Sequence, residues 1–460
     1  MSRTAPATSV TQDPPGIWVV PIEGEADRSI VYEPLDGLAF VGNGAMAEVA
    51  LTYPDGRRNG ARAEQARRFL DEIGFCPRPV PTAPPIRTAF RPRSVALLTT
   101  NRCQLRCVYC YAAAGEGALR ELPLERAFAA IEHVARVALE DGREDFELAF
   151  HGGGEPTTAW KLIRAATEHA RAQLVPATIT LTSNGVWGPA RCRWIIENLD
   201  GLTVSVDGMP STQDRNRPFE DGHGSSAVVM RNLAELDRHD VAYGLRMTAV
   251  APWDRLVEDV RFLLERTRAR VLRIEPAFGT GRGGHGEPMG TDVDDFVEAF
   301  LLAWDDARRV GAELLYTGAD VSSARWSFCS APEDALIVTP AGDVVTCYEV
   351  VDAAHPLARL STVGTLDGGG LELDLEARAE LRARIAARRA SCRDCHCYWT
   401  CAGDCYVRAF EPGPGGHLVR GERCRLNRTL TREILLRLIA ESGGVWRRGQ
   451  VRRAPHRAAG

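Results

Sequence analysis

From residue 95 onward, short apolar runs alternate with longer amphipathic stretches. The runs that predict strands are VALLTT (95–100), DFELAF (145–150), TITLTS (178–183), LTVSVD (202–207), YGLRMTAV (243–250) and VLRIEPA (271–277). Stretches between them, such as LERAFAAIEHVARVALED, have helical spacing, so the pattern predicts a parallel sheet covered by helices. Six units are too few for a closed eight-fold barrel. We therefore expect an α/β fold centred on an open partial (β/α)6 barrel over residues 95–315, with its active site at the carboxyl ends of the strands.

A different pattern precedes the barrel. Three runs rich in β-branched and aromatic residues predict short strands: IWVVPI, SIVYEPL and LAFVGN. GAMAEVALTY and AEQARRFLDEIGF then show helical spacing. Residues 17–80 are expected to form a small α+β module, preceded by sixteen disordered residues. A Pro-rich linker over residues 81–94 is expected to join the module to the barrel.

The chain after the barrel is rich in cysteine. Residues 316–430 contain eight of the thirteen cysteines and few long helical patterns. Residues 431–460 are expected to form a helix followed by a basic tail. In this tail the last fifteen residues, WRRGQVRRAPHRAAG, are predicted to be disordered.

Charge and hydropathy limit the kinds of partner and the cellular compartment that we expect. The net charge of −5 gives no reason to expect a nucleic-acid partner. There is no apolar run long enough to span a membrane, and the N-terminal residues lack the apolar core of a signal peptide. We therefore expect a cytoplasmic protein without a membrane partner. In a reducing compartment, clustered thiols favour metal ligation over disulfides.

Three cysteines follow the first barrel strand. Cys103, Cys107 and Cys110 lie in NRCQLRCVYCY, whereas a closed tetrahedral metal site takes four ligands and a disulfide takes two. Three thiolates on one loop can hold three irons of a cubane cluster and leave the fourth iron open for chemistry. The alternative is a zinc site completed by a distant histidine.

The CxxxCxxC pattern after the first strand of a β/α barrel, with Tyr109 before its last cysteine, resembles the radical SAM enzymes. The resemblance implies a [4Fe–4S] cluster whose open iron binds the amino and carboxylate groups of S-adenosylmethionine (SAM). An electron from a flavodoxin- or ferredoxin-type donor then releases a 5′-deoxyadenosyl radical.

Further motifs match this family in order along the barrel. HGGGEPTT follows the second strand, TSNG and SVDG end the third and fourth strands, and an arginine stands twelve residues beyond the serine of SVDG. Turn chemistry alone is the alternative for several of these polar residues. The resemblance implies SAM contacts by Tyr109, Gly153, Gly154, Glu155, Ser183, Asn184, Ser205, Asp207, Arg217 and Leu272.

The cysteines after the barrel have the spacing C…GxxxxC…CxxCxxxxxCxxxC…C. This array resembles the SPASM domain of radical SAM enzymes that act on peptides and proteins, and the resemblance implies two auxiliary [4Fe–4S] clusters. One would be held by Cys392, Cys395, Cys401 and Cys424, and the other by Cys329, Cys347 and Cys405. Relatives have another cysteine about six residues before Cys329, where this chain has serine. The second of these clusters is therefore expected to have an open iron or to use Cys397.

These resemblances favour one function. A small strand-rich module before a radical SAM core is similar to elements that capture the leader of a precursor peptide as an added strand; a simple capping subdomain is the alternative. We expect a maturase of ribosomally made peptides that installs an intramolecular cross-link. The second hypothesis is an anaerobic sulfatase-maturing, formylglycine-forming enzyme. Such enzymes carry Asp after the cysteine matching Cys347, and this chain has Tyr348. A non-catalytic zinc-binding protein is the third.

Overall fold

The computed structural model describes residues 14–54, 60–85, 89–277, 282, 293–367, 370–409 and 421–449. Most of the N-terminal segment that the sequence predicts to be disordered lies outside these ranges, as do residues 450–460 of the basic tail. Among the described residues, no helix combines the length and the apolar character needed to cross a bilayer.

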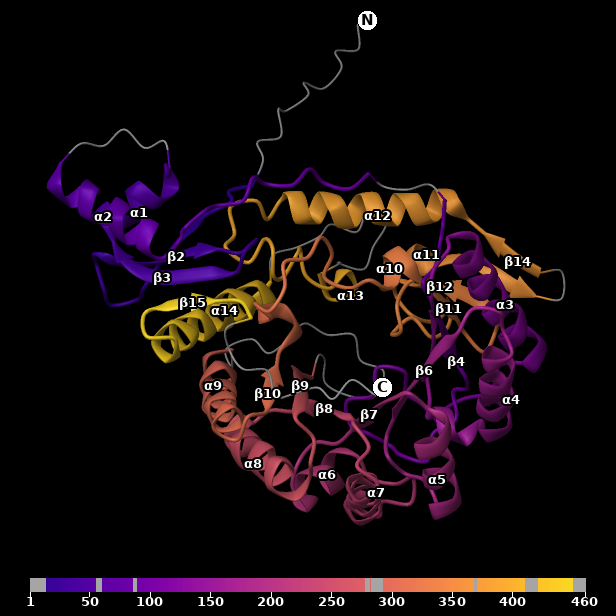
Figure 1. Cartoon of the computed structure of the whole chain (residues 1–460). Coiled ribbons are helices and arrows are strands. Elements are labelled where there is room, and N and C mark those ends of the chain that lie inside the picture. The colour runs from indigo at the N-terminus through magenta and orange to yellow at the C-terminus, as the bar shows by residue number, and fades with distance from the viewer. Residues whose placement is uncertain are drawn as a thin grey trace, which may run out of the picture.

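Seven parallel strands form the centre of the molecule and curve into an open arc (Figure 1). They are β4 (Ser94–Leu98), β5 (Phe146–His151), β6 (Ala177–Ser183), β7 (Gly201–Ser205), β8 (Gly244–Ala249), β9 (Val271–Pro276) and β10 (Glu313–Leu315). All six predicted strands are present, and the arc does not close into a barrel. β10 is an additional strand that pairs in parallel with β9.

Helices cover the outside of this arc. They are α3 (Leu124–Glu140), α4 (Trp160–Arg171), α5 (Pro189–Asn198), α6 (Pro210–Asn216), α7 (Ser226–Arg238), α8 (Leu256–Arg266) and α9 (Val293–Arg309), with short 3-10 turns η1 (Pro156–Thr158), η2 (Trp253–Arg255) and η4 (Thr317–Ala319). In α3, Ala127, Ile131 and Val134 recur at helical spacing and are buried. Each fully buried aliphatic side chain of this kind stabilises the fold by about 1.5–3 kcal/mol.

The sheet continues beyond β4 into the cysteine-rich part of the chain. β11 (Ala335–Val338) pairs in parallel with β4, and three antiparallel strands follow it: β12 (Asp343–Val345), β13 (Thr362–Asp367) and β14 (Gly370–Leu373). The helices of this region are α10 (Ala331–Asp334), α11 (Ala358–Ser361), α12 (Leu375–Ala390), α13 (Tyr406–Ala409) and α14 (Glu422–Glu441). The boundary expected between residues 430 and 431 is wrong, because it falls inside α14.

The N-terminal module contains the three predicted strands and both predicted helices. These are β1 (Trp18–Pro21), β2 (Arg28–Glu33), β3 (Leu38–Asn43), α1 (Gly44–Leu51) and α2 (Ala61–Glu72). A fourth strand, β15 (Val445–Arg447), comes from the other end of the chain and pairs antiparallel with β3. The expected disorder of the last fifteen residues is therefore wrong for Trp446, whose side chain is only 3% exposed.

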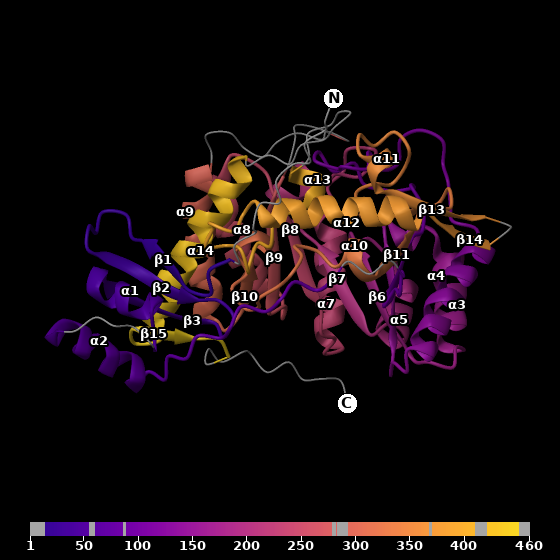
Figure 2. The same cartoon turned by 90° about the horizontal axis from the view of Figure 1, so that it is seen from above.

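Both faces of this small sheet are covered. Val31 and Phe40 face α1 and α2, whereas Ile30 and Tyr32 point the other way and join the main core of the molecule. This alternation follows from the two-residue period of a strand. On the second face, α14 packs between the module and α9 (Figures 1 and 2). The module is thus part of the body of the protein.

Candidate active site

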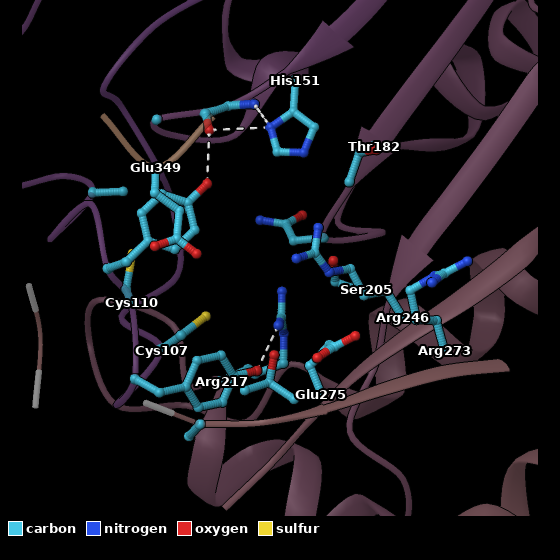
Figure 3. A pocket seen from close by; sticks show the side chains of 18 of the residues that line it. Cys107, Cys110, His151, Thr182, Ser205, Arg217, Arg246, Arg273, Glu275 and Glu349 are labelled. Atoms are coloured by element: carbon cyan, nitrogen blue, oxygen red, sulfur yellow. Dashed lines mark hydrogen bonds between the residues drawn. The ribbon is translucent and has the colours of Figure 1, made fainter. Parts of the chain in front are cut away.

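A cavity of about 450 Å³ opens at the carboxyl ends of the barrel strands. Its walls come from the cysteine loop after β4, the glycine-rich loop after β5, the ends of β6 to β9, and several segments of the cysteine-rich region. Figure 3 shows Cys107 and Cys110 on one side of the cavity and Ser205, Arg246 and Arg273 on the other. The position is the one expected for an active site in a parallel α/β fold.

The cysteine loop brings its three thiols to the same cavity. The backbone N–H of Cys110 donates to the carbonyl of Cys107 at 3.2 Å, and the amide of Asn184 donates to Cys103 Sγ at 3.8 Å. Burial raises the pKa of Cys103 to about 12, so its thiol is protonated in the metal-free chain. Three convergent thiols on one short loop suit an iron–sulfur cluster.

The glycine-rich loop lies directly on the cysteine loop. Gly154 donates its N–H to Thr100 O at 2.7 Å, and Glu155 donates its N–H to Arg102 O at 2.8 Å. A Cβ on Gly154 would lie 2.2 Å from Arg102 O, which no side chain tolerates. The sequence predicts glycine here for close approach to a ligand, and the structure adds a second reason: the two loops themselves need this approach.

Glu155 is buried and connects three segments. Its carboxylate accepts from Ser183 Oγ, from the backbone N–H of Asn184 and from Thr157 Oγ1, each at 2.7 Å. Oε1 takes the two hydroxyl bonds and a third from the backbone N–H of Thr157 at 3.1 Å, whereas Oε2 takes only the one from Asn184. Because a carboxylate oxygen can accept two bonds, Oε2 retains capacity for a further donor in the cavity.

Tyr109, Asp207 and Arg217 form a buried network beneath the cysteine loop. The hydroxyl of Tyr109 donates to Asp207 Oδ2 at 2.7 Å and accepts from Arg217 Nη1 at 2.7 Å. Burial raises the pKa of Asp207, and the Arg217 charge opposes this shift. The network fixes the ring of Tyr109 and the guanidinium of Arg217 at the cavity wall.

Most of the predicted SAM contacts lie together. The structure places these residues in the cavity lining: Tyr109, Gly153, Gly154, Glu155, Ser183, Asn184, Ser205 and Arg217. Asp207 lies behind this lining, where it holds Tyr109. Leu272 does not reach the cavity, because it stands at the start of β9 with its side chain in the core. Arg273 and Glu275 line the cavity from the same strand.

The sequence from the end of β4 to α8 has a family match. Residues 97–262 match the Radical SAM superfamily. This part of the chain belongs to the radical SAM superfamily. Members of the family use a [4Fe–4S] cluster and SAM, and the three thiols, the glycine-rich loop and the spare oxygen of Glu155 fit such a pair.

Two of the curated proteins similar to this chain are named as maturation proteins. A serine-type anaerobic sulfatase-maturating enzyme of Klebsiella aerogenes is 23% identical over 336 residues, which are 66% of this chain and 76% of the relative. The sporulation killing factor maturation protein SkfB of Bacillus subtilis is 26% identical over 218 residues, 46% of this chain and half of the relative. The chain is a radical SAM enzyme related to both.

Solved structures share the fold. The structure of native anSMEcpe with bound AdoMet has a TM-score of 0.59 and is 16% identical, covering 76% of this chain and 99% of that one. Streptococcus suis SuiB bound to its precursor peptide SuiA has a TM-score of 0.51 and is 13% identical, covering 85% and 96%. These similarities show the radical SAM fold across the barrel and its C-terminal extension.

Three more cysteines gather at the cavity from the cysteine-rich region. Cys329 and Cys405 line the cavity, and Cys347 lies behind them. Burial raises the pKa of Cys347, and the charges of Glu349, Cys405 and Cys329 add to this shift, which shows how close these groups are. We call Cys329, Cys347 and Cys405 the cavity thiols.

The remaining cysteines of the array form a second group farther from the cavity. We call Cys392, Cys395, Cys401 and Cys424 the outer thiols. Burial raises the pKa of Cys424 with a further contribution from Cys392, and burial raises that of Cys401 with a contribution from Cys395. Arg388 donates to Cys424 Sγ at 3.3 Å. Among the described residues, no three His, Cys, Asp or Glu side chains converge on a single-ion site; a cubane distributes its thiolates over four irons.

Cys397 lies with the outer thiols. Its buried thiol donates to Asn427 O at 3.6 Å, and the hydrogen bond that Cys395 shares with Cys397 is the main reason why the pKa of Cys395 is raised. Its neighbours are therefore in the second group, away from the cavity thiols.

Several cavity residues were not anticipated from the sequence. The rings of His151 and Tyr348 are in contact, with centroids 4.6 Å apart and planes tilted by 36°, and Glu349 pairs with Arg408 at 2.6 Å. Arg246 and Arg273 were also missed, although a signal was present. Parallel strands buried on both faces are normally apolar throughout, so an arginine in GLRMTA or VLRIEP marks an inward position.

Proposed function

We propose that this radical SAM enzyme abstracts hydrogen from a ribosomally made precursor peptide and closes an intramolecular cross-link. The observation that carries the proposal is the arrangement of one cavity with two sets of thiols. The cysteine loop lines one part of it, and Cys329 and Cys405 line another. Two redox sites facing one substrate space suit a reaction that removes a hydrogen atom and then an electron from the same molecule.

In this proposal, Cys103, Cys107 and Cys110 hold the cluster that binds SAM. Glu155 accepts from the SAM ammonium group through its spare oxygen, and Arg217 pairs with the SAM carboxylate. When bound, the cluster and SAM supply a carbon-centred radical that abstracts hydrogen. The chain itself orients the substrate and limits the access of water to the cavity.

We further propose that the cavity thiols and the outer thiols each hold an auxiliary [4Fe–4S] cluster. The cavity thiols number three, so one iron of their cluster is open towards the peptide. The position of Cys397 beside Cys395 and Asn427 supports a chain without a fourth cysteine ligand at this site. A Cys397→Ala variant is then expected to retain its full iron content. Loss of about four irons would show that Cys397 is a ligand.

The N-terminal module is proposed to bind the leader of the precursor. Strand addition requires a free sheet edge, and β15 occupies the edge of β3. The edges that remain are β1 and the three-residue β15, so the leader is expected to add to β1. Hydrogen exchange tests this: addition of full-length precursor should protect amides of Trp18–Val20, whereas a core peptide without leader should not. Protection confined to other elements would disprove this site.

Formylglycine formation on a sulfatase is the second candidate, favoured by the 23% identity over 336 residues. Against it, Tyr348 replaces the expected Asp and its ring contacts that of His151. Glu349 is the nearest carboxylate in sequence, and Arg408 already pairs with it. The family match displaces the third hypothesis, a non-catalytic zinc-binding protein, for the barrel.

One experiment separates the two enzymatic functions. Reconstituted, reduced enzyme is incubated with SAM and either a precursor peptide encoded beside its gene or a cysteine-containing sulfatase peptide. The proposal predicts deoxyadenosine and a precursor product lighter by two hydrogen atoms. An aldehyde on the sulfatase peptide, detected with a hydrazide, would instead establish formylglycine formation. The C103A/C107A/C110A variant is the control and should form no deoxyadenosine while retaining about two-thirds of the iron.

A further inference from the structure

Two arginines lie side by side inside the barrel. Arg246 on β8 is in register with Arg273 on β9, and also with Ser205 on β7. Residues in register on adjacent parallel strands point to the same face from strands about 4.8 Å apart. All three side chains line the cavity. Two guanidinium groups, both permanently charged, therefore line the same cavity.

The carboxylates of the cavity do not neutralise this pair. The three that line it are Glu155, Glu275 and Glu349. Glu155 is bound by the end of β6, Glu349 pairs with Arg408, and Glu275 Oε1 accepts from the backbone N–H of Thr317 at 3.0 Å. In the described ranges of the chain, no carboxylate oxygen lies within 4.0 Å of the guanidinium nitrogens of Arg246 or Arg273.

Their other contacts are few. Arg273 Nη1 donates to Thr317 Oγ1 at 2.8 Å, and the Arg246 side chain makes no hydrogen bond to any residue in the described part of the protein. The effect of Arg246 reaches across the cavity: burial lowers the pKa of His151 to about 4, and the Arg246 charge adds to this shift. Arg246 is thus a cation with free donors that faces open space.

The remaining arginines of the cavity have protein partners. Arg217 is bound by Tyr109, Arg408 by Glu349, and Arg423 by Asp404 at 2.8 Å. These three also lie nearest to the thiols: Arg217 lowers the pKa of Cys107, and Arg423 and Arg408 lower that of Cys405, against the larger effect of burial. The charge of Arg246 and Arg273 is therefore left for a ligand.

We propose that Arg246 and Arg273 form a carboxylate-binding subsite that takes an acidic side chain of the peptide substrate. The inference rests on the proposed function and deepens it by naming the substrate class. Two guanidinium groups in one cavity present planar, charge-assisted donors, and a bound carboxylate can accept from both. Arg246 and Arg273 lie opposite the cysteine loop, whereas Arg217, the group assigned to the SAM carboxylate, lies beside it (Figure 3).

Glutarate, each end of which presents a carboxylate on a methylene stem as a glutamate side chain does, provides the probe. Isothermal titration calorimetry on the reconstituted enzyme should show glutarate binding and no binding of its uncharged twin, glutaramide. The variants R246Q and R273Q should each weaken glutarate binding about tenfold or more, since each removes a charge-assisted hydrogen bond. The glutarate affinity of R246K should lie between those of the two glutamine variants and that of the wild type. R193Q, on the exposed surface of α5, is the matched control and should bind as the wild type does.

Competition distinguishes the two sources of a carboxylate. The proposal predicts that saturating SAM leaves glutarate bound. Displacement by SAM but not by decarboxylated SAM would assign the subsite to the SAM carboxylate and overturn the assignment to the substrate. The titration uses no peptide, so its result can be interpreted even if the peptide assay shows no change in mass. Failure of the subsite proposal can therefore be distinguished from failure of the proposed function.

Thermal unfolding separates binding from a structural role. If Arg246 serves ligand binding, R246Q should unfold at the same temperature as the wild type or higher, because the change removes no hydrogen bond or ion pair within the described part of the protein. Equal glutarate affinity of R246Q and the wild type would overturn the proposal. So would a lower unfolding temperature of R246Q, because it would reveal a partner for Arg246 within the protein.

Discussion

Glu33, at the end of β2, is a buried carboxyl group with one oxygen unpartnered among the described residues. Its Oε2 accepts from the N–H of Asp36 at 2.7 Å, whereas Oε1 is buried without a hydrogen bond there. Burial raises the pKa of Glu33 from 4.5 to about 7. The folded state thus holds this proton more tightly than the unfolded state, so the free energy of unfolding falls as pH rises from about 4.5 to about 7 and then levels off.

An E33Q variant should lose this pH dependence. We expect the stability of E33Q relative to wild type to rise between pH 5 and pH 8 by about 1–2 kcal/mol, measured from unfolding temperatures at each pH. E72Q on the exposed face of α2 is the control and should follow the wild type at both pH values. A parallel pH profile for E33Q and wild type would contradict the assignment.

Substitution of Gly154 is expected to weaken SAM binding. Alanine at this position would drive its Cβ against Arg102 O, so the glycine-rich loop or the cysteine loop must shift. We expect G154A to bind SAM at least about tenfold more weakly in equilibrium dialysis and to lose about 1–3 kcal/mol of stability. At Gly188 an added Cβ meets no atom within 4 Å, which makes G188A the matched control. Equal SAM affinity in G154A and G188A would contradict the close packing of the loops.

Some residues of the site can be predicted from a local sequence motif, whereas others depend on the pairing of distant strands. The thiols, Gly154 and Glu155 belong to short motifs that can be recognised from neighbouring residues alone. Arg246, in contrast, acquires its meaning only from Arg273, twenty-seven residues away, because the register of two strands brings them together. Leu272 is predicted to make a backbone contact to SAM from its place along the sixth strand, and its side chain lies in the core, whereas Arg273 and Glu275 of the same strand line the cavity.

At the level of elements, β15 shows what short strands contribute. Trp446 is the middle residue of this strand, pairs with Ala39 of β3 and is nearly fully buried. We expect W446A to lower the free energy of unfolding by about 3–5 kcal/mol, the usual cost of removing a buried tryptophan. L174A, which truncates an apolar side chain that is 87% exposed, should change stability by less than about 0.5 kcal/mol. Chemical denaturation measures both, and similar values for the two variants would show that β15 does not stabilise the module.

Elements with a long periodic pattern were predicted well, and very short ones were not. The six barrel strands and α3 repeat their apolar positions often enough to reveal their period. β10 and β15 have three residues each, ELL and VWR, and three residues contain no period. Their strand character comes from the partners β9 and β3, which lie far away in the sequence.

For the whole molecule, the N-terminal module is not a detachable unit. Tyr32 and Ile30 of the module belong to the main core, Arg432 on α14 pairs with Glu23 at 2.6 Å, and Arg448 donates to the carbonyl of Pro34 at 2.6 Å. Deletion of residues 1–80 would expose one face of α14 and leave β15 unpaired.

We therefore expect the protein without residues 1–80 to aggregate and to bind less iron than the full chain. Size-exclusion chromatography and iron analysis measure both quantities. Intact enzyme carried through the same purification and cluster reconstitution is the control. A monodisperse truncated protein with the full iron content would show that the module contributes little to the fold of the body.

The pairing of β3 with β15 also constrains how the protein is made. The ribosome synthesises β3 early and residues 445–447 some four hundred residues later. One edge of the nascent module is therefore uncovered while the barrel and the cysteine-rich region are translated. An uncovered edge is a site of association with other chains. The edge of β3 is covered only when residues 445–447 have emerged, so any product that ends before them keeps this edge exposed to aggregation and proteolysis.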